Sequence, residues 1–293
     1  MEMSVRPRRS FLYMPGSNAR ALEKAKSLAA DGLIFDLEDA VAPDAKEEAR
    51  RLVMTAVTGG GYGRREVMIR INGLGTPWGF DDVWAAARSG ADGILVPKTE
   101  SADMLRQVEV ILESAGAPAD LDLWAMMETP RGILAAESIA QATPRLAGLI
   151  MGTSDLAKDL HAAHTRERLP MFHSLAHCLL VARAYGLAAI DGVHLDLGDD
   201  DGFAFSCRQG LEMGFDGKTL IHPKTIAVAN QIFAPGEDEL AWSHRIIAAH
   251  NDATEAGKGV VVVDGRLVEN LHVVNARRIV ALAEQIALME GGI

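Results

Sequence analysis

Eight short apolar runs, separated by stretches of helical periodicity, occupy the first four-fifths of the chain. They cover residues 11–14, 33–35, 67–69, 94–96, 123–127, 149–151, 188–190 and 219–221. Strands of a parallel sheet are covered on both faces, so they are unbroken apolar runs. Eight strand–helix units in about 230 residues match a (β/α)8 barrel better than an open sheet by count and length. The pattern predicts an α/β fold, a (β/α)8 TIM barrel, while a doubly wound sheet remains a rival on the pattern alone.

Amphipathic segments lie between the runs and predict helices over residues 19–30, 44–58, 103–114 and 171–185. Beyond residue 233 the pattern changes to a helix over 237–256, a strand over 260–263, an Asp264-Gly265 turn, a strand over 266–269 and a final helix. We therefore expect a catalytic barrel over residues 1–233 and a helix-hairpin-helix extension over 234–293. The extension is either a lid or subunit contact, or a cap on the barrel, and composition favours the cap.

Charge and cysteine content exclude several classes of protein. The 29 Lys and Arg residues against 40 Asp and Glu residues give a net charge of −11, the wrong sign for binding nucleic acid. Cys178 and Cys207 cannot form a disulfide framework or a zinc motif, which indicates a reducing compartment. The N-terminus has no apolar stretch before a cleavage site, and no apolar run is long enough to cross a bilayer. We expect a cytoplasmic protein with no membrane and no nucleic-acid partner.

Acidic residues follow several of the predicted strands. A barrel of this kind carries its active site at the carboxyl ends of its strands. Those ends supply the DLED motif of residues 36–39, and also Glu128 and Asp155. Several carboxylates at one mouth repel one another unless a cation lies among them, and oxygen ligands suit Mg²⁺ or Mn²⁺. The sequence therefore predicts a divalent-metal site at the barrel mouth.

Glu128 and Asp155 are the predicted metal ligands, because they end successive strands and should be neighbours at the rim. The alternative is that both are first-turn or capping acids of helices, which suits Asp155 better than Glu128. Asp36, Glu38 and Asp39 either ligate the metal, hold metal-bound waters, or cap the loop that follows them.

Two basic residues at strand ends need anionic partners. Arg70 follows a buried strand, so it faces either a substrate carboxylate or oxyanion, or one of the DLED acids in a structural ion pair. Lys98 poses the same question; a Schiff-base role is disfavoured because the mouth is built for a metal cation. Other signals fail: a phosphate loop would need Gly at position 212, which is Glu212, and His173 with His177 has no third ligand. There is no Gly-x-Ser-x-Gly elbow either.

Seven short motifs in order carry a family resemblance. They are FLYMPG (11–16), FDLEDAV (35–41), RING (70–73), VPK (96–98), ETP (128–130), GTSDL (152–156) and GKTLIHP (217–223). Together they resemble the citrate lyase beta-subunit-like family of CoA-ester lyases from about residue 9 to residue 280. LWAMMETP, MGTSDLAK and FDGKTLIHP resemble in particular its short malyl-CoA lyase-like members, which include (3S)-malyl-CoA thioesterases.

The resemblance implies a (β/α)8 barrel with Mg²⁺ held by Glu128 and Asp155, and with Arg70 on the acyl or glyoxylate oxygens. It implies that CoA lies across the mouth near the first strand, where Tyr13, Arg20 and Lys24 are candidate contacts. Gly152 and Thr153 are then expected beside the substrate, with Asp36 and Glu38 among the catalytic acids. The family uses its C-terminal segment as a lid over a neighbouring subunit's site, which implies a homotrimer or homohexamer.

One position departs from the family pattern. The family's lid carries an Asp after the hairpin turn, whereas this chain has Glu269, which is one methylene longer. Both thioester hydrolysis and retro-Claisen cleavage use the same metal and Arg70, and the departure favours hydrolysis of a malyl-CoA-type thioester. The alternatives are a retro-Claisen lyase for malyl-CoA or citramalyl-CoA, a citrate lyase beta chain with a substrate on an acyl-carrier protein, and a non-catalytic barrel.

Overall fold

The computed structural model describes residues 5–255 and 261–291. The described residues divide into two compact units, Arg8–Phe233 and a second unit made of residues 5–7, 234–255 and 261–291. Each unit is described by itself below.

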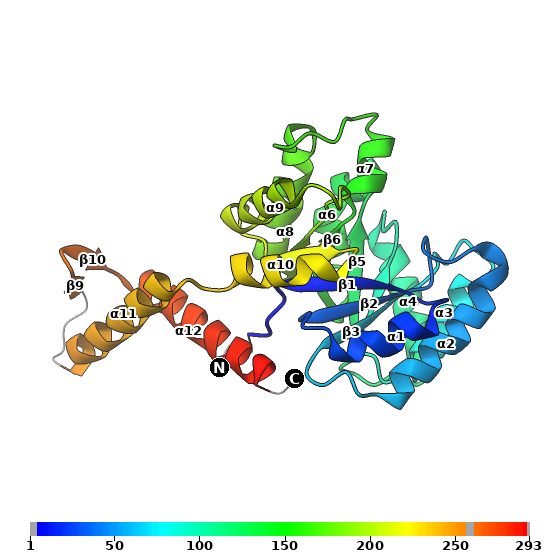
Figure 1. Cartoon of the computed structure of the whole chain (residues 1–293), viewed down its shortest axis with the longest axis horizontal. Coiled ribbons are helices and arrows are strands. Elements are labelled where there is room, and N and C mark those ends of the chain that lie inside the picture. The colour runs from blue at the N-terminus through cyan, green and yellow to red at the C-terminus, as the bar shows by residue number, and fades with distance from the viewer. Residues whose placement is uncertain (1–4, 256–260, 292–293) are drawn as a thin grey trace. The chain divides into compact units, whose positions relative to one another are not determined.

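The first unit is a closed barrel of eight strands in the order β1 to β8, with every neighbouring pair parallel (Figure 1). The strands are β1 (Ser10–Pro15), β2 (Gly32–Asp36), β3 (Glu66–Arg70), β4 (Gly93–Val96), β5 (Asp122–Met127), β6 (Leu146–Met151), β7 (Ala188–Asp191) and β8 (Gly217–Leu220). All eight predicted strands are present, so the predicted (β/α)8 barrel is confirmed and the doubly wound alternative is wrong.

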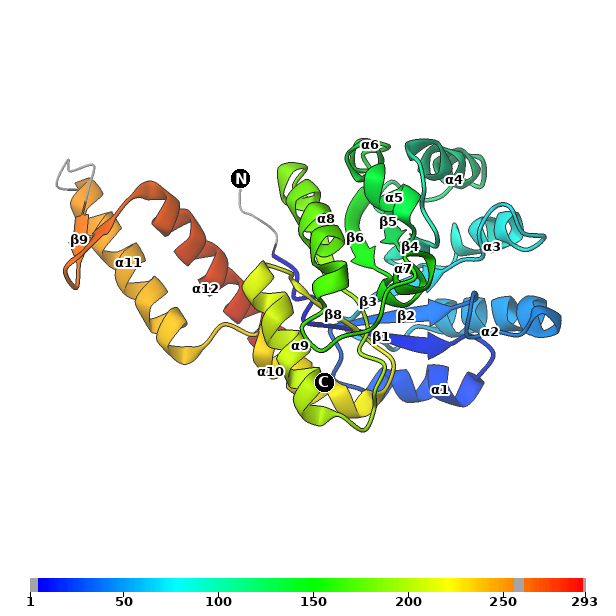
Figure 2. The same cartoon turned by 90° about the horizontal axis from the view of Figure 1, so that it is seen from above.

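Helices connect the strands and lie around the outside of the barrel (Figure 2). The α-helices are α1 (Ala19–Lys24), α2 (Lys46–Gly59), α3 (Gly79–Ala86), α4 (Ala102–Ser114), α5 (Pro130–Leu134), α6 (Ala136–Ala140), α7 (Thr153–Asp159), α8 (Phe172–Ala184), α9 (Asp200–Met213) and α10 (Ile226–Phe233). Short 3-10 turns are η1 (Ala25–Ser27), η2 (Pro43–Ala45), η3 (Leu169–Met171) and η4 (Pro223–Thr225). The helix predicted over 19–30 ends early because the Ser27 hydroxyl donates to the Lys24 carbonyl over 2.9 Å and Leu28 is extended.

Two apolar layers follow from the alternation of side chains along each strand. The barrel interior is filled by Phe11, Ile34, Met68, Leu95, Trp124, Met126, Ile150, Ala188 and Ile190. The residues between them face outward and pack under the helices in a larger cluster. Gly148 makes room for the indole of Trp124, because a Cβ at that position would lie 2.3 Å from the ring.

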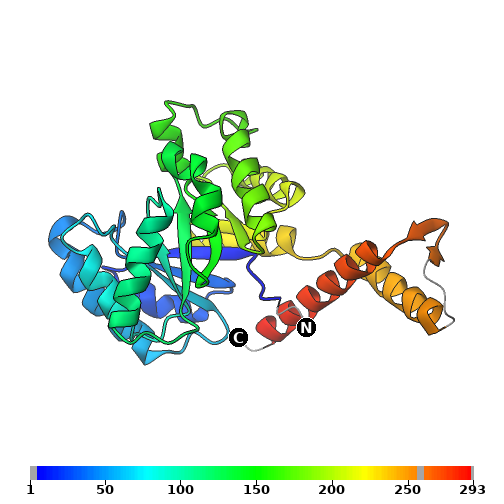
Figure 3. The same ribbon diagram turned by 180° about the vertical axis from the view of Figure 1, so that it is seen from behind.

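The second unit contains α11 (Glu237–Glu255), β9 (Val261–Val263), β10 (Arg266–Val268) and α12 (Asn270–Glu290), which are orange to red in Figure 3. Asp264 and Gly265 have φ values of 48° and 77°, as a two-residue hairpin turn requires. Its own apolar core contains Ile246, Val263, Val268, Val273 and Ala276. The order matches the predicted helix-hairpin-helix; the predicted ends at residues 256 and 260 lie outside the described residues. None of the described helices is long and apolar enough to cross a membrane.

Candidate active site

Four polar residues at strand ends continue the interior face of the barrel. Each lies two residues beyond a member of the interior core, so its side chain points the same way. The four residues are Tyr13, Asp36, Arg70 and Glu128. The alternation of strand residues therefore brings together at the barrel mouth side chains that are far apart in the sequence.

Arg70 and Asp36 form a buried ion pair. They are direct neighbours in the register of β2 and β3, and Arg70 Nε and Nη2 donate to Asp36 Oδ1 and Oδ2 over 2.7 and 2.6 Å. Asp36 also accepts the backbone N–H groups of Glu38 and Ala40 over 2.8 and 3.1 Å. The sequence left two possible partners for Arg70, a substrate oxyanion or an acid of the DLED motif. The structure shows that Asp36 of the DLED motif is a partner. Because each Asp36 oxygen has two donors, this carboxylate is well suited to orient Arg70.

The third nitrogen of Arg70 contacts a second acid and a sulfur atom. Nη1 lies 3.0 Å from Glu38 Oε2 and 3.8 Å from the sulfur of Met126. The guanidinium carbon also lies 4.9 Å from the centre of the Tyr13 ring, a cation–π distance. Burial raises the pKa of Tyr13 above its ordinary value, which keeps the phenol neutral under the cation. Tyr13 thus belongs to the Arg70 cluster, and its predicted contact with CoA stays a prediction.

The other two candidate CoA contacts, Arg20 and Lys24, lie on α1 and are exposed to solvent. Their exposure leaves them open to a phosphate ligand, but it is also what a solvated helix face shows.

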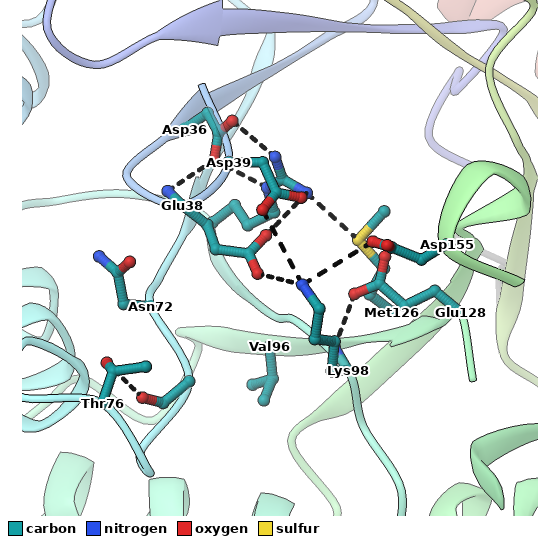
Figure 4. Close-up of polar contacts among 12 residues, drawn as sticks. Asp36, Glu38, Asp39, Asn72, Thr76, Val96, Lys98, Met126, Glu128 and Asp155 are labelled. Atoms are coloured by element: carbon teal, nitrogen blue, oxygen red, sulfur yellow. Dashed lines mark hydrogen bonds and ion pairs between the residues drawn. The ribbon is translucent and has the colours of Figure 1, made fainter. Parts of the chain in front are cut away.

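Lys98 lies between two groups of acids, immediately after β4. Its Nζ is 2.5 Å from Glu38 Oε1, 3.8 Å from Asp155 Oδ2 and 4.0 Å from Asp39 Oδ1 (Figure 4). The sequence marked Lys98 as a basic residue in need of a partner but did not indicate which acids it contacts.

Glu128 and Asp155 lie side by side, as predicted from their successive strands (Figure 4). Glu128 is 2% exposed, and its Oε1 accepts the backbone N–H of Lys98 over 2.7 Å. Burial raises the pKa of Glu128 to about 8. Burial would also raise the pKa of Asp155, but hydrogen bonding with Lys158 and the charge of Lys98 hold it below its ordinary value. Two neighbouring carboxyl groups, one of them buried, repel each other when both are ionised. They therefore share either a proton or a bound cation.

Gly152 allows the close approach of Glu128 to the start of α7. A Cβ at Gly152 would lie 2.3 Å from Glu128 Cβ and 2.6 Å from its Oε2. The reason is the register of β5 and β6, in which Met127 and Met151 are partners and the next two residues meet. Thr153, which is buried, begins α7 two residues before Asp155. Gly152 therefore lies against Glu128, and Thr153 lies in the same first turn of α7 as Asp155; their contact with the substrate stays a prediction.

The donor set fits a magnesium ion. Five carboxyl groups surround Arg70 and Lys98; they belong to Asp36, Glu38, Asp39, Glu128 and Asp155. Glu38 Oε2 is buried and makes no hydrogen bond. Within residues 5–255 and 261–291, no three His, Cys, Asp or Glu side chains are grouped to enclose a metal. Mg²⁺ prefers a site in which one or two protein carboxylates bind the ion and water or substrate oxygens occupy its other coordination positions.

Two other strand-end residues do not face the mouth. Asp191 points outward from β7 towards α9, where Gly210 lies against it. It pairs with Lys218 Nζ over 2.8 Å and with Arg168 Nη1 over 2.7 Å. Lys218 is fully buried within β8, which explains why an apolar pattern placed that strand at 219–221. His222 is exposed, and its Nδ1 accepts the N–H of Lys224 over 3.1 Å.

Comparison with known proteins identifies the family of the chain. Residues 9–223 match the family model described as HpcH/HpaI aldolase/citrate lyase. This chain belongs to the HpcH/HpaI aldolase/citrate lyase family. The match covers all eight strands of the barrel and both predicted metal ligands.

Relatives in this family resemble nearly the whole chain. A (3S)-malyl-CoA thioesterase of Cereibacter sphaeroides (strain KD131 / KCTC 12085) is 50% identical over 287 residues, which is 98% of each protein. The citrate lyase subunit beta of Escherichia coli (strain K12) is 34% identical over 294 residues, or 99% of this chain and 97% of that one. The protein CitE from Mycobacterium tuberculosis, solved in complex with magnesium, acetoacetate and coenzyme A, has a TM-score of 0.75 at 30% identity. That comparison covers 94% of this chain and 97% of CitE.

Glu269, the remaining predicted catalytic residue, is the N-cap residue of α12 in the second unit. Its backbone N–H donates to His272 Nδ1 over 2.9 Å. The side chain is exposed, so it is open to contact with another molecule. Its catalytic role stays a prediction.

Proposed function

We propose that this chain is a Mg²⁺-dependent enzyme that hydrolyses a malyl-CoA-type hydroxyacyl-CoA thioester. The observation that carries the proposal is the Glu128–Asp155 carboxyl pair beside the Arg70–Asp36 ion pair at the barrel mouth. The thioesterase from Cereibacter sphaeroides supports the substrate class, and the CitE complex supports magnesium and CoA. The reaction takes place in the cytoplasm, a location that suits the free, buried Cys178 and Cys207.

Glu128 and Asp155 hold the metal. Mg²⁺, or Mn²⁺ with its similar preference for oxygen ligands, supplies Lewis-acid polarisation of the substrate oxygens when it is bound. Gly152 allows the two ligands to lie close, Thr153 begins the helix that carries Asp155, and the Lys98 N–H orients Glu128. Two protein ligands would leave the remaining positions of the ion open to water and to substrate oxygens.

Arg70 binds the substrate's acyl oxygens. Asp36 occupies its Nε and Nη2, so Nη1 is the nitrogen outside the two-pronged pair; it lies 3.0 Å from Glu38 Oε2 and 3.8 Å from the sulfur of Met126. A thioester oxygen that gains negative charge during the reaction is a much better acceptor than a thioether. Arg70 thereby stabilises the developing charge, while Asp36 acts as a positioning residue.

Glu38 is the base for hydrolysis. Its Oε2 is buried and makes no hydrogen bond, although it lies 3.0 Å from Arg70 Nη1, and burial raises the pKa of this carboxyl above its ordinary value. Oε2 takes a proton from water, whose oxygen attacks the thioester carbonyl carbon. The carbon–sulfur bond then breaks, and the CoA thiolate leaves and takes up the proton. The products are the free hydroxyacid and CoA.

The C-terminal extension supplies Glu269 to the site of a neighbouring subunit in a homotrimer or homohexamer. A retro-Claisen lyase needs an acid positioned to protonate the enolate carbon, and a carboxyl group one methylene longer than Asp is misplaced for that step. Hydrolysis needs no protonation of carbon and is then the preferred reaction, in which Glu269 passes the proton on to the CoA thiolate. Gel filtration measures the subunit number, and turnover of free malyl-CoA separates this enzyme from a chain that needs a carrier protein.

CoA release from malyl-CoA, followed with a thiol reagent, tests the proposal. We expect turnover with Mg²⁺, loss of turnover in excess EDTA, and recovery when Mg²⁺ is restored. Glu128→Ala and Asp155→Ala should each abolish metal-dependent turnover while circular dichroism shows the fold intact, because each removes a ligand and no apolar core. The matched control is Asp103→Ala, which removes an exposed acid on α4. Wild-type turnover in either ligand variant would contradict the metal assignment.

A further inference from the structure

The backbone of Lys98 is held in an unusual conformation. Its φ of 45° lies in the left-handed region, which a residue with a side chain adopts only at a cost. Three hydrogen bonds hold the turn: Lys98 N–H to Glu128 Oε1 over 2.7 Å, Thr99 N–H to the Met126 carbonyl over 3.2 Å, and Thr99 Oγ1 to the Val96 carbonyl over 2.9 Å. The turn therefore fixes the start of the Lys98 side chain beside the metal ligands.

The ammonium group of Lys98 lies among carboxylates from two sides of the mouth. Glu38 and Asp39 come from the loop after β2, and Asp155 comes from α7 (Figure 4). With Glu128 they form what we call the acid cluster. The Nζ is 2.5 Å from Glu38 Oε1 and 3.8 Å from Asp155 Oδ2, so it bridges a proposed base and a proposed metal ligand.

We propose that Lys98 is a tethered counter-cation of the acid cluster, which opposes the binding of Mg²⁺ until a substrate carboxylate draws the ammonium group away. The inference rests on the proposed metal role of Glu128 and Asp155. It makes Lys98 a positioning residue that couples metal binding to substrate binding.

The charge balance supports this role. A divalent ion bound by Asp155 has to lie close to an ammonium group that is itself 3.8 Å from that carboxylate. Like charges at such range repel strongly when they are partly removed from water. An incoming substrate carboxylate provides Lys98 with a new partner, and the repulsion falls as the ammonium moves. Because binding linkage is reciprocal, the metal then strengthens substrate binding by the same factor.

A Schiff-base role for Lys98 does not fit its surroundings. Its Nζ donates to Glu38 Oε1 over 2.5 Å, so this nitrogen is engaged as a hydrogen-bond donor. An amine whose nitrogen is held as an ammonium donor is a poor nucleophile.

Lys158 provides a matched control. Its Nζ contacts the same carboxylate, at 3.2 Å from Asp155 Oδ1, but its side chain is 69% exposed and screened by water. Lys158→Met therefore removes a positive charge near Asp155 but leaves the positive charge of Lys98 inside the acid cluster. Lys98→Met removes the enclosed charge, and Lys98→Arg keeps it.

Isothermal titration calorimetry of Mg²⁺ tests the proposal, in the absence and presence of malate as a dicarboxylate probe. We expect Lys98→Met to bind Mg²⁺ alone roughly tenfold more tightly than wild type, with Lys158→Met and Lys98→Arg within about threefold of wild type. Malate should tighten Mg²⁺ binding in wild type and lose that effect in Lys98→Met. The metal-free Lys98→Met protein should also melt at a lower temperature than metal-free wild type, and Mg²⁺ should remove this difference in melting temperature.

The sign of the change separates the proposal from a structural role. A residue that only supports the fold would weaken Mg²⁺ binding when removed, so unchanged or weaker binding in Lys98→Met overturns the inference. Lys98→Gln is the second variant if Lys98→Met does not fold, with the same expected and contradicting results. If the wild-type protein binds no Mg²⁺ either with or without malate, the proposed function itself is overturned.

Discussion

The guanidinium of Arg70 and the carboxylate of Asp36 meet in a two-pronged ion pair, with N–O distances of 2.7 and 2.6 Å, across the ends of neighbouring strands. The pair fixes the guanidinium at the barrel mouth, with Nη1 outside the two-pronged contact. It also explains why a buried arginine is tolerated at the end of β3.

Arg70→Lys tests the need for that geometry. A lysine keeps the positive charge but cannot bind Asp36 with two nitrogens and an acyl oxygen with a third. We expect kcat/KM to fall about 100- to 1000-fold, the usual cost of losing a donor to a developing oxyanion. The matched control is Arg106→Lys, an exposed arginine on α4 paired with Asp103. Near-normal kinetics for Arg70→Lys would mean that Arg70 has only a structural role.

Gly152→Ala tests the packing of the metal ligands. The new methyl carbon would lie 2.3 Å from Glu128 Cβ, so Glu128 has to move. We expect Mg²⁺ affinity in calorimetry to fall by at least about tenfold, and the free energy of unfolding in urea to fall by about 1–3 kcal/mol. Gly59→Ala, which has open space around its Cβ at the end of α2, should change neither value greatly. Wild-type Mg²⁺ affinity in Gly152→Ala would show that Glu128 is not a ligand.

Asp191 tests the buried ion cluster outside the barrel and its dependence on pH. Burial would raise the pKa of Asp191, but Lys218 and Arg168 hold it below the ordinary value of 3.8. A lowered carboxyl pKa stabilises the fold at pH values above 3.8, and that stability is lost as the pH falls further. We expect Asp191→Asn to lower the free energy of unfolding at pH 7 by about 3–5 kcal/mol, because two cations lose their partner.

The pH series supplies the check on Asp191. Urea unfolding of wild type should show stability falling below pH 4, and the slope should be shallower in Asp191→Asn. Equal slopes in the two proteins would show that Asp191 does not contribute to acid unfolding. Asp103→Asn, at an exposed ion pair on α4, is the control substitution.

Glu269 tests the assignment of the reaction. We expect Glu269→Gln to lower hydrolysis by about tenfold or more, because the amide cannot exchange a proton. Glu269→Asp should shift the products towards glyoxylate and the shorter acyl-CoA, because it restores the acid of the family's lid. Glu284→Gln, an exposed glutamate on α12, is the control. If both Glu269 variants keep the wild-type rate and products, Glu269 is a solvated surface residue with no catalytic role.

The sequence predicted the strands, and it predicted that Glu128 and Asp155 lie side by side, because both depend on short, local patterns. Apolar runs locate a strand, and consecutive strands of a barrel are neighbours, so Glu128 and Asp155 had to be close. The contacts of Lys98 were out of reach because a left-handed turn after β4 directs the side chain. A strand-end residue can also face either way: Asp191 lies on the outer face of β7, and its partner Lys218 interrupts the apolar pattern of β8.

The products formed from malyl-CoA and Mg²⁺, identified by liquid chromatography and mass spectrometry, test the central claim most directly. If the enzyme is the hydrolase proposed here, malate and free CoA accumulate together in equal amounts, and EDTA stops both. Glyoxylate and acetyl-CoA as the main products would contradict the preference for hydrolysis and make the enzyme a retro-Claisen lyase, and no Mg²⁺-dependent product at all would contradict the assignment of this site as catalytic.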